Sequence, residues 1–184
     1  MEWLREIFSY VCGQQHNWAP GGVNLPFCQR CTGLYVGAVP ALLLILGFKP
    51  KPTSRILWLH GICMLVMIPF GYHLLAQTGE ERTLTGQLFA FGLIYYLTLL
   101  PADRLPKWKA LWQSNSQSYL IACVMVLLGL QVDIAWGGLH TNAALSLLGL
   151  AGLVLYVFLV LLNFALLLVF AWEFIHTRTR LSKT

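Results

Sequence analysis

The pattern of apolar and polar positions divides the chain into five long apolar runs joined by short polar segments. These runs cover residues 32–48, 56–76, 84–100, 119–136 and 143–172. An α-helix needs about 20 apolar residues to cross a hydrocarbon core of about 30 Å, and the first four runs are close to that length. The fifth has about 30 residues and would reach about 45 Å as a helix, so one end should project or the helix should tilt. We therefore predict an all-α polytopic membrane protein with about five transmembrane helices.

Composition agrees with this class, since 58% of the residues are hydrophobic and only 10% are charged, outside the range of soluble globular proteins. The runs leave no room for a separate soluble domain, so residues 1–184 are expected to form one membrane domain. Its parts are an N-terminal segment (1–31), the bundle (32–172) and a basic tail (173–184). The first eleven residues place apolar side chains on one helical face, which predicts a short amphipathic interfacial helix rather than a cleavable signal peptide.

The net charge of +5 is distributed in short basic clusters between the apolar runs, which is how orientation is set in a bilayer and argues against nucleic-acid binding. Lys and Arg concentrate in the first loop, the third loop and the tail. With these segments inside, the amino terminus lies outside and the carboxyl terminus is cytoplasmic, as in a multi-pass protein of the cytoplasmic (inner) membrane. Five aromatic residues are expected to form a belt near the inner interface: Trp58, Trp108, Trp112, Tyr119 and Trp172.

A cysteine- and histidine-rich segment precedes the first run. It places Cys12, His16, Cys28 and Cys31 within 20 residues. Four soft ligands at this spacing can close around one tetrahedral metal ion, and zinc fits them best. The Cys28/Cys31 pair can instead be a redox dithiol with Cys12 as its resolving partner, because a C-x-x-C outside the cytoplasmic membrane can exchange disulfides. A third reading keeps these cysteines as inert small hydrophobes.

Other residues inside the runs are interpreted as packing positions. Small residues recur every four positions at Gly33, Gly37 and Ala41, which predicts close approach to another helix. Cys63 and Cys123 each stand alone within a run and are expected to pack as small hydrophobes. His60 is interpreted as an interface or packing residue, because no acidic residue is near it in the sequence.

The predicted topology gathers most of the non-basic ionisable residues near the bilayer at the outer ends of the helices. Ionisable groups at membrane edges are costly and are therefore functional candidates. Besides the cysteine cluster, the candidates for an outer-face polar site are His73, Gln77, Glu80, Arg82, Asp133 and His140. Arg82 is expected either to pair with Glu80 or Glu81, or to bind an anionic headgroup or carboxylate through its two-pronged guanidinium. For the two histidines, a plain interfacial role is an equal alternative.

Two motifs resemble those of the prokaryotic membrane-protein family catalogued as domain of unknown function 2085. The first is C-x3-H followed by P-F-C-x-R-C-T-G-x-Y-x-G, formed by Cys12, His16, Pro26, Phe27, Cys28, Arg30, Cys31, Thr32, Gly33, Tyr35 and Gly37. The second is a polar segment with R-x-x-T-G, formed by Gln77, Gly79, Arg82, Thr85, Gly86 and Gly92. The resemblance covers about residues 12–92. It implies a prokaryotic membrane protein with a site on these residues, and it implies no reaction.

Three functions remain open from the sequence, and whether the chain is an enzyme is left undecided among them. The first is a Cys3His zinc-type site on the outer face, either structural or supporting an activity on a lipid-like substrate. The second is a membrane thiol oxidoreductase that uses Cys28 and Cys31. The third is a non-catalytic accessory subunit bound to other membrane subunits. The chain contains no P-loop, serine nucleophile elbow or H-E-x-x-H motif.

Overall fold

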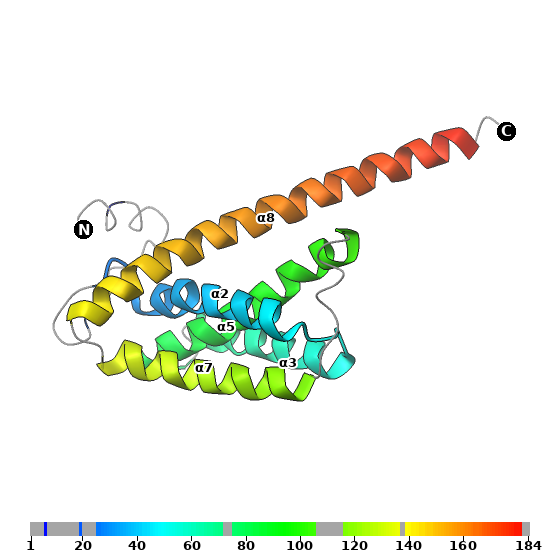
Figure 1. Cartoon of the computed structure of the whole chain (residues 1–184). Helices are drawn as coiled ribbons and strands as arrows, with labels where there is room; N and C mark the ends of the chain where they lie inside the picture. Colours follow the sequence, from blue (N-terminus) through cyan, green and yellow to red (C-terminus); the bar gives the residue numbers. More distant parts are fainter. Residues whose placement is uncertain are drawn as a thin grey trace.

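Helices account for every regular element in the described part of the computed structural model. It describes residues 6, 19, 25–71, 75–105, 116–136 and 139–181, with the backbone alone at 71, 139–142 and 177–181. The helices are α2 (Gln29–Phe48), α3 (Ser54–Leu65), α4 (Met67–Gly71), α5 (Gly79–Arg104), α7 (Ser116–Trp136) and α8 (Leu139–Leu181). Figure 1 shows α2, α3, α5 and α7 gathered into a bundle, with α8 crossing it and extending past it. The predicted all-α class is confirmed.

Four of the described helices are long and apolar enough to cross a membrane: α2, α5, α7 and the 143–176 part of α8. The second predicted span differs, because α3 ends at Leu65 and α4 begins at Met67. Pro69 explains the break, since a proline has no N–H and its ring clashes with the carbonyl four residues earlier, here that of Leu65. The apolar segment Ser54–Phe70 is therefore shorter than a full span. The described part supports several membrane helices and does not establish the predicted count of five.

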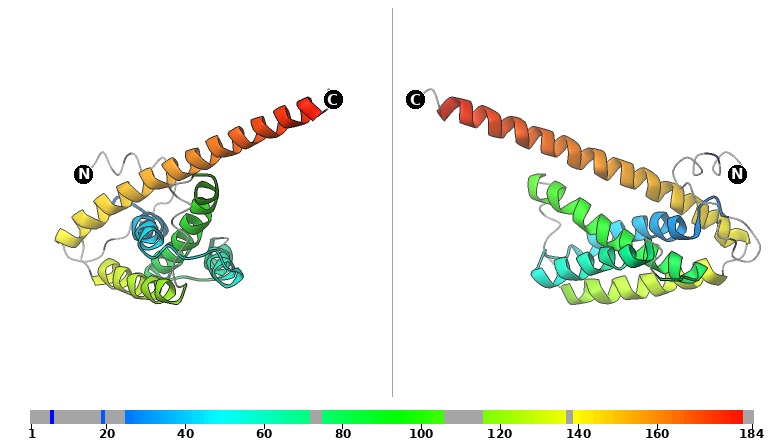
Figure 2. Two further views of the ribbon diagram at one scale, coloured as in Figure 1. Left: turned by 45° about the vertical axis from the view of Figure 1, so that its right-hand side comes forward. Right: turned by 180° about the vertical axis from the view of Figure 1, so that it is seen from behind.

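α2 is the central helix and makes its most extensive contact with α5, with further contacts to α7 and α8. Figure 2 shows it near the middle of the bundle, beneath α8. Glycines allow the close approach to α5: a Cβ at Gly33 would overlap the carbonyl oxygen of Thr83, and one at Gly86 would overlap that of Arg30. Gly37, one turn after Gly33, also lies against α5. The predicted small-residue contact is confirmed at Gly33 and Gly37, and Ala41, the third predicted position, is buried.

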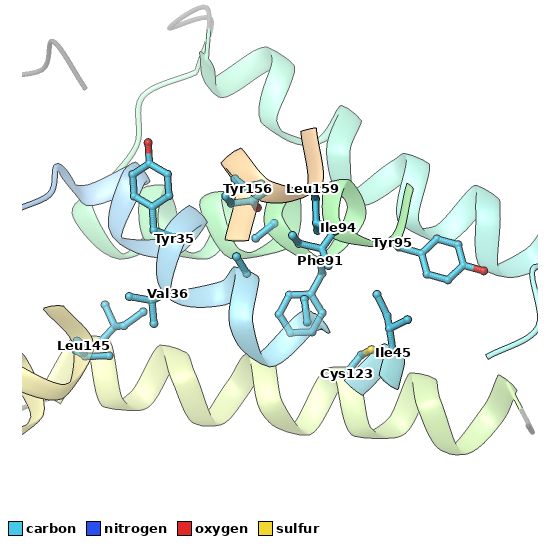
Figure 3. Close-up of a cluster of buried hydrophobic side chains, with 14 of the residues drawn as sticks. Tyr35, Val36, Ile45, Phe91, Ile94, Tyr95, Cys123, Leu145, Tyr156 and Leu159 are labelled. Carbon is cyan, nitrogen blue, oxygen red and sulfur yellow. The ribbon is translucent and has the colours of Figure 1, made fainter. Parts of the chain in front are cut away.

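The buried core lies where α2, α5, α7 and α8 meet (Figure 3). Its side chains include Tyr35, Val36, Ile45, Phe91, Ile94, Tyr95, Cys123, Leu145, Tyr156 and Leu159. The outer surface is also apolar: only 17% of the hydrophobic window of α7 and 11% of that of α8 are buried. A water-soluble protein rarely exposes apolar patches of such extent, whereas a lipid-facing surface requires them.

α8 is one continuous helix of 43 residues, or about 64 Å, roughly twice the hydrocarbon thickness of a bilayer. It includes residues 139–142, which belong to the segment between the fourth and fifth apolar runs, and it continues through most of the predicted tail as far as Leu181. Asn163 fastens it to α5, because its Nδ2 donates hydrogen bonds to the carbonyls of Leu97 and Leu159, both at 2.8 Å.

The described members of the predicted aromatic belt differ in their exposure. Trp58 and Trp172 are largely exposed, as residues of an interfacial belt would be. Tyr119 is not one of them, since only 1% of its surface is exposed. Its hydroxyl lies 2.9 Å from Nε2 of the buried His60, which draws the ring into the core. Trp108 and Trp112 lie outside the described residues, as does the predicted amphipathic helix apart from position 6.

Candidate functional site at the Cys28 end of the bundle

Cys28 and Cys31 form the first turn of α2 and so mark one end of the bundle, here called the Cys28 end. Cys28 is the N-cap residue, with φ −69° and ψ 163°, and its Sγ accepts a hydrogen bond from the Cys31 N–H at 3.4 Å. The backbone N–H of Thr32 donates to the Cys28 carbonyl at 2.8 Å, and its hydroxyl donates to the same oxygen at 3.0 Å. Cys28 is 3% exposed and Cys31 is half-buried. The helix start thus holds two thiols in one turn.

The predicted metal site is only half described. Cys12 and His16 lie outside the described residues. Among the residues that are described, no three His, Cys, Asp or Glu side chains come together as a metal-binding group. Cys28 and Cys31 are not joined to each other by a disulfide in the structure. Both remain positioned as neighbours on one helical turn, which is compatible with the metal reading and with the redox reading.

Arg30, between the two cysteines, connects α2 to the chain that leads into α5. Its Nη2 donates to the carbonyl of Phe70 at 2.9 Å and to Oε1 of Gln77 at 3.3 Å. Gln77 in turn donates through Nε2 to the hydroxyl of Thr85 at 3.5 Å. The Arg30 Nε is buried and has no hydrogen-bond partner among the described residues. The structure therefore brings Gln77, an outer-face candidate, to the turn that carries the cysteines.

The start of α5 lies at the same end and contributes Arg82. Thr78 caps this helix in a capping box: Glu81 Oε2 accepts the Thr78 N–H at 2.8 Å, and the Glu81 N–H donates to the Thr78 hydroxyl at 3.3 Å. Arg82 Nη1 donates to Oε1 of Gln29 at 3.2 Å. The expected ion pair of Arg82 with Glu80 or Glu81 is wrong, since the one salt bridge within the described residues joins Arg104 to Asp103. Capping occupies Glu81 instead.

A layer of neutral polar side chains lies behind these arginines, between α5 and α7. Gln131 donates through Nε2 to the Glu80 carbonyl at 3.1 Å and to the Thr83 hydroxyl at 3.0 Å. Its Oε1 accepts Nε2 of Gln87 at 3.0 Å. Gln87 is fully buried, and its Oε1 has no partner among the described residues. Sequence reasoning missed Thr83, Gln87 and Gln131; for the two glutamines the signal was a polar residue inside an apolar run, because such residues need partners in a membrane.

The remaining outer-face candidates are not brought into this network by the described contacts. Asp133 is exposed on α7, two residues from Gln131, and makes no ion pair with a described residue. The Glu80 side chain is exposed, and only its carbonyl takes part in the network. His73 lies outside the described residues, and at His140 the structure gives only the backbone of the first turn of α8. The Cys28 end thus gathers Cys28, Cys31, Gln77 and Arg82.

His60 belongs to a second polar cluster, deeper in the bundle. Its ring stacks on Tyr95 at a centroid distance of 4.2 Å. Its Nδ1 lies 2.9 Å from the Ile56 carbonyl and its Nε2 lies 2.9 Å from the Tyr119 hydroxyl. A carbonyl can only accept, so Nδ1 carries the proton and Tyr119 donates to Nε2. This satisfied arrangement confirms the interpretation of His60 as a packing residue.

Comparison with known proteins gives one match. No curated protein and no solved structure matches the chain. A family model described as "Predicted membrane protein (DUF2085)" matches residues 12–96, which include Cys12, His16, Cys28 and Cys31 and end within α5. This agrees with the several long apolar helices of the structure. Residues 12–96 of this membrane protein therefore belong to the DUF2085 family.

Proposed function

We propose that this membrane protein binds one zinc ion through Cys12, His16, Cys28 and Cys31, and that the ion fastens the segment before α2 to the bundle. The supporting observation is the hydrogen bond from the Cys31 N–H to Cys28 Sγ at 3.4 Å. Zinc ligands are oriented by such second contacts, and a backbone donor lowers the cost of a buried thiolate. Two thiols on one turn fit two corners of a tetrahedral Cys3His site.

The role of this ion is structural in the proposal. A closed four-ligand zinc site leaves no open position for a substrate, and the bound metal contributes to folding stability. Cys28 is almost fully buried, which suits a ligand that is not exchanged.

A thiol oxidoreductase is the second candidate, and the placement of Cys28 and Cys31 in the first turn of α2 favours it. A helix start stabilises a thiolate, and joining the two thiols would pass two electrons and two protons to the disulfide of a partner protein. The burial of Cys28 argues against the thiol oxidoreductase. Since Cys28 is 3% exposed, attack on an outside disulfide would have to begin from the half-buried Cys31.

The orientation in the membrane is part of the proposal. Because α2 runs from the Cys28 end toward Lys49, the exposed residues Lys51 and Arg55 lie at its far end. Lys and Arg remain preferentially on the cytoplasmic side, so this distribution supports an outward Cys28 end in the cytoplasmic membrane of a prokaryote. A reporter fused after Thr184 should be active when it requires the cytoplasm; activity only when it requires the outside would overturn this orientation.

Metal content and thiol state of the full-length protein, purified in detergent without chelators, test the function. We expect about one zinc ion per chain, lost in Cys28→Ser and Cys31→Ser. Cys63→Ser is the matched control, because it removes a thiol that the proposal leaves out, and it should keep the ion. Metal-free protein with Cys28 disulfide-linked to Cys31 would replace the zinc proposal by the redox candidate. Metal-free protein with reduced, unreactive thiols would overturn both.

A further inference from the structure

A groove runs along α3 where this helix leaves α5 uncovered. Its volume is about 290 Å³, and it is lined by Ser54, Leu57, Trp58, Gly61 and Leu65 of α3 and by Tyr96 of α5. Gly61 provides room in it, since a Cβ there would lie 3.2 Å from the Tyr96 hydroxyl oxygen. That hydroxyl already donates to the Leu57 carbonyl at 2.8 Å, so the floor offers no unpaired donor. The groove is suited to an apolar occupant.

The shape of the groove matches one leaflet of a bilayer. Its lining extends from Ser54, the first residue of α3, to Leu65, the last. At 1.5 Å per residue this is about 16 Å, close to half of the hydrocarbon thickness of about 30 Å. Trp58 and Leu65 flank it with exposed fractions of 70% and 55%, so the groove opens on the lipid-facing surface. A single acyl chain lying along α3 fits these dimensions.

The charge at one end of the groove identifies the headgroup. Lys51 and Arg55 are exposed beside Ser54, and neither makes an ion pair with a described residue. The stretch from Lys49 to Leu65 contains no acidic residue. Basic residues that flank a groove between membrane helices attract anionic lipid headgroups, each by about 1 kcal/mol, or about fivefold in binding. A zwitterionic lipid would gain far less from the same two charges.

A second cavity on α3 provides a comparison. It has a volume of about 200 Å³ and lies among α3, α5 and α7, where His60, Cys63 and Cys123 are part of its lining. No Lys or Arg lines it, and its surface is almost entirely apolar. It has room for a ring the size of benzene, because a cavity of about 150 Å³ can bind benzene. No charged side chain lines it that could select a lipid headgroup. The basic residues at one end therefore distinguish the groove between α3 and α5 from this cavity.

We propose that the groove between α3 and α5 is a binding site for an anionic phospholipid. Lys51, Arg55 and the Ser54 hydroxyl contact the phosphate, and one acyl chain lies along Leu57, Gly61 and Leu65. The lipid comes from the leaflet on the side of the loop between α2 and α3.

Lipid retention by the full-length protein tests the site. The protein is incubated in detergent with equal amounts of phosphatidylglycerol and phosphatidylcholine, and bound lipid is counted by native mass spectrometry. We expect preferential retention of phosphatidylglycerol, reduced about 25-fold in the double variant Lys51→Gln/Arg55→Gln, at about fivefold per charge. Filling the groove by Gly61→Leu should abolish the retention of this lipid. Leu65→Trp fills the exposed end of the groove without entering the core and replaces Gly61→Leu if that variant does not fold.

Two control variants separate the site from general effects. Arg104→Gln removes one exposed positive charge at the end of α5, away from the groove, and should leave lipid retention unchanged. Val124→Phe fills the second cavity instead and should also have no effect. Equal retention of the two lipids by the unmodified protein would overturn the proposal. Loss of binding in the charge variant with full binding in both groove-filling variants would also overturn it, because the chain would then not occupy the groove.

Discussion

A methyl group at position 33 would enter the backbone of α5, which makes Gly33→Ala a direct test of the packing between α2 and α5. The added Cβ would overlap the Thr83 carbonyl oxygen and would lie 2.8 Å from its carbonyl carbon and 2.9 Å from the Gln87 nitrogen. Ordinary contacts begin at 3.4 Å. The helices must therefore separate by at least about 0.5 Å, because backbone atoms cannot rotate away as a side chain can. Overpacking of this kind costs about 1–3 kcal/mol.

The matched control is Gly47→Ala in the same helix, where a Cβ would meet nothing within 4 Å. Alanine favours helix over glycine by up to about 1 kcal/mol, so this variant should be unchanged or slightly more stable. Unfolding in mixed micelles with increasing SDS, followed by tryptophan fluorescence, measures both. Equal stability of the two variants would refute the close approach of α2 and α5.

Two further predictions concern polar contacts between helices, and the same unfolding assay measures them. Tyr119→Phe removes the donor to the buried His60 Nε2 and should lower the free energy of unfolding by about 1–3 kcal/mol. Adding His60→Phe to this variant should recover part of the loss, because both partners are then removed. Strictly additive losses in the double variant would contradict the pairing. Asn163→Leu removes the donor to the Leu97 carbonyl and should cost about 0.6 kcal/mol, at most about 1.7. Asn163→Gln, which keeps the amide, is its control, and a cost as large as that of Asn163→Leu would contradict a role for the amide donor.

The helices and their closest contact could be predicted because both depend on local sequence patterns. Apolar run length identifies a membrane helix, and the spacing of Gly33 and Gly37 identifies the face that approaches another helix. The end of a helix inside an apolar run is harder to predict. The run from 56 to 76 continues past Leu65 without any change in polarity, and α8 likewise continues beyond residue 172 as helix.

The candidate site was predictable for thiols, charged residues and polar residues outside the apolar runs, and not for the neutral residues Gln87 and Gln131 inside them. Cys28, Cys31, Gln77 and Arg82 were found because such groups are rare near a membrane. The hydrogen-bond partner of each residue could not be predicted from the sequence. Arg82 contacts Gln29, 53 positions away, rather than the glutamates beside it, because Glu81 is engaged in capping α5. Hydrogen bonds between residues so far apart in the sequence depend on how the helices cross, and the periodicity of the sequence gives no information about that crossing.

The two prolines at positions 69 and 101 illustrate the same limit. Each deprives the carbonyl four residues earlier of its helical donor. Before Pro69, α3 ends at Leu65. At Pro101, by contrast, α5 continues to Arg104, and the amide of Asn163, 66 positions away on α8, donates to the carbonyl of Leu97. In lipid no water can replace a missing donor, so a proline is tolerated inside a helix where a neighbouring helix supplies one. The same local signal thus accompanies a break at Pro69 and a continuous helix at Pro101, where the replacement donor is a residue that only the fold brings near.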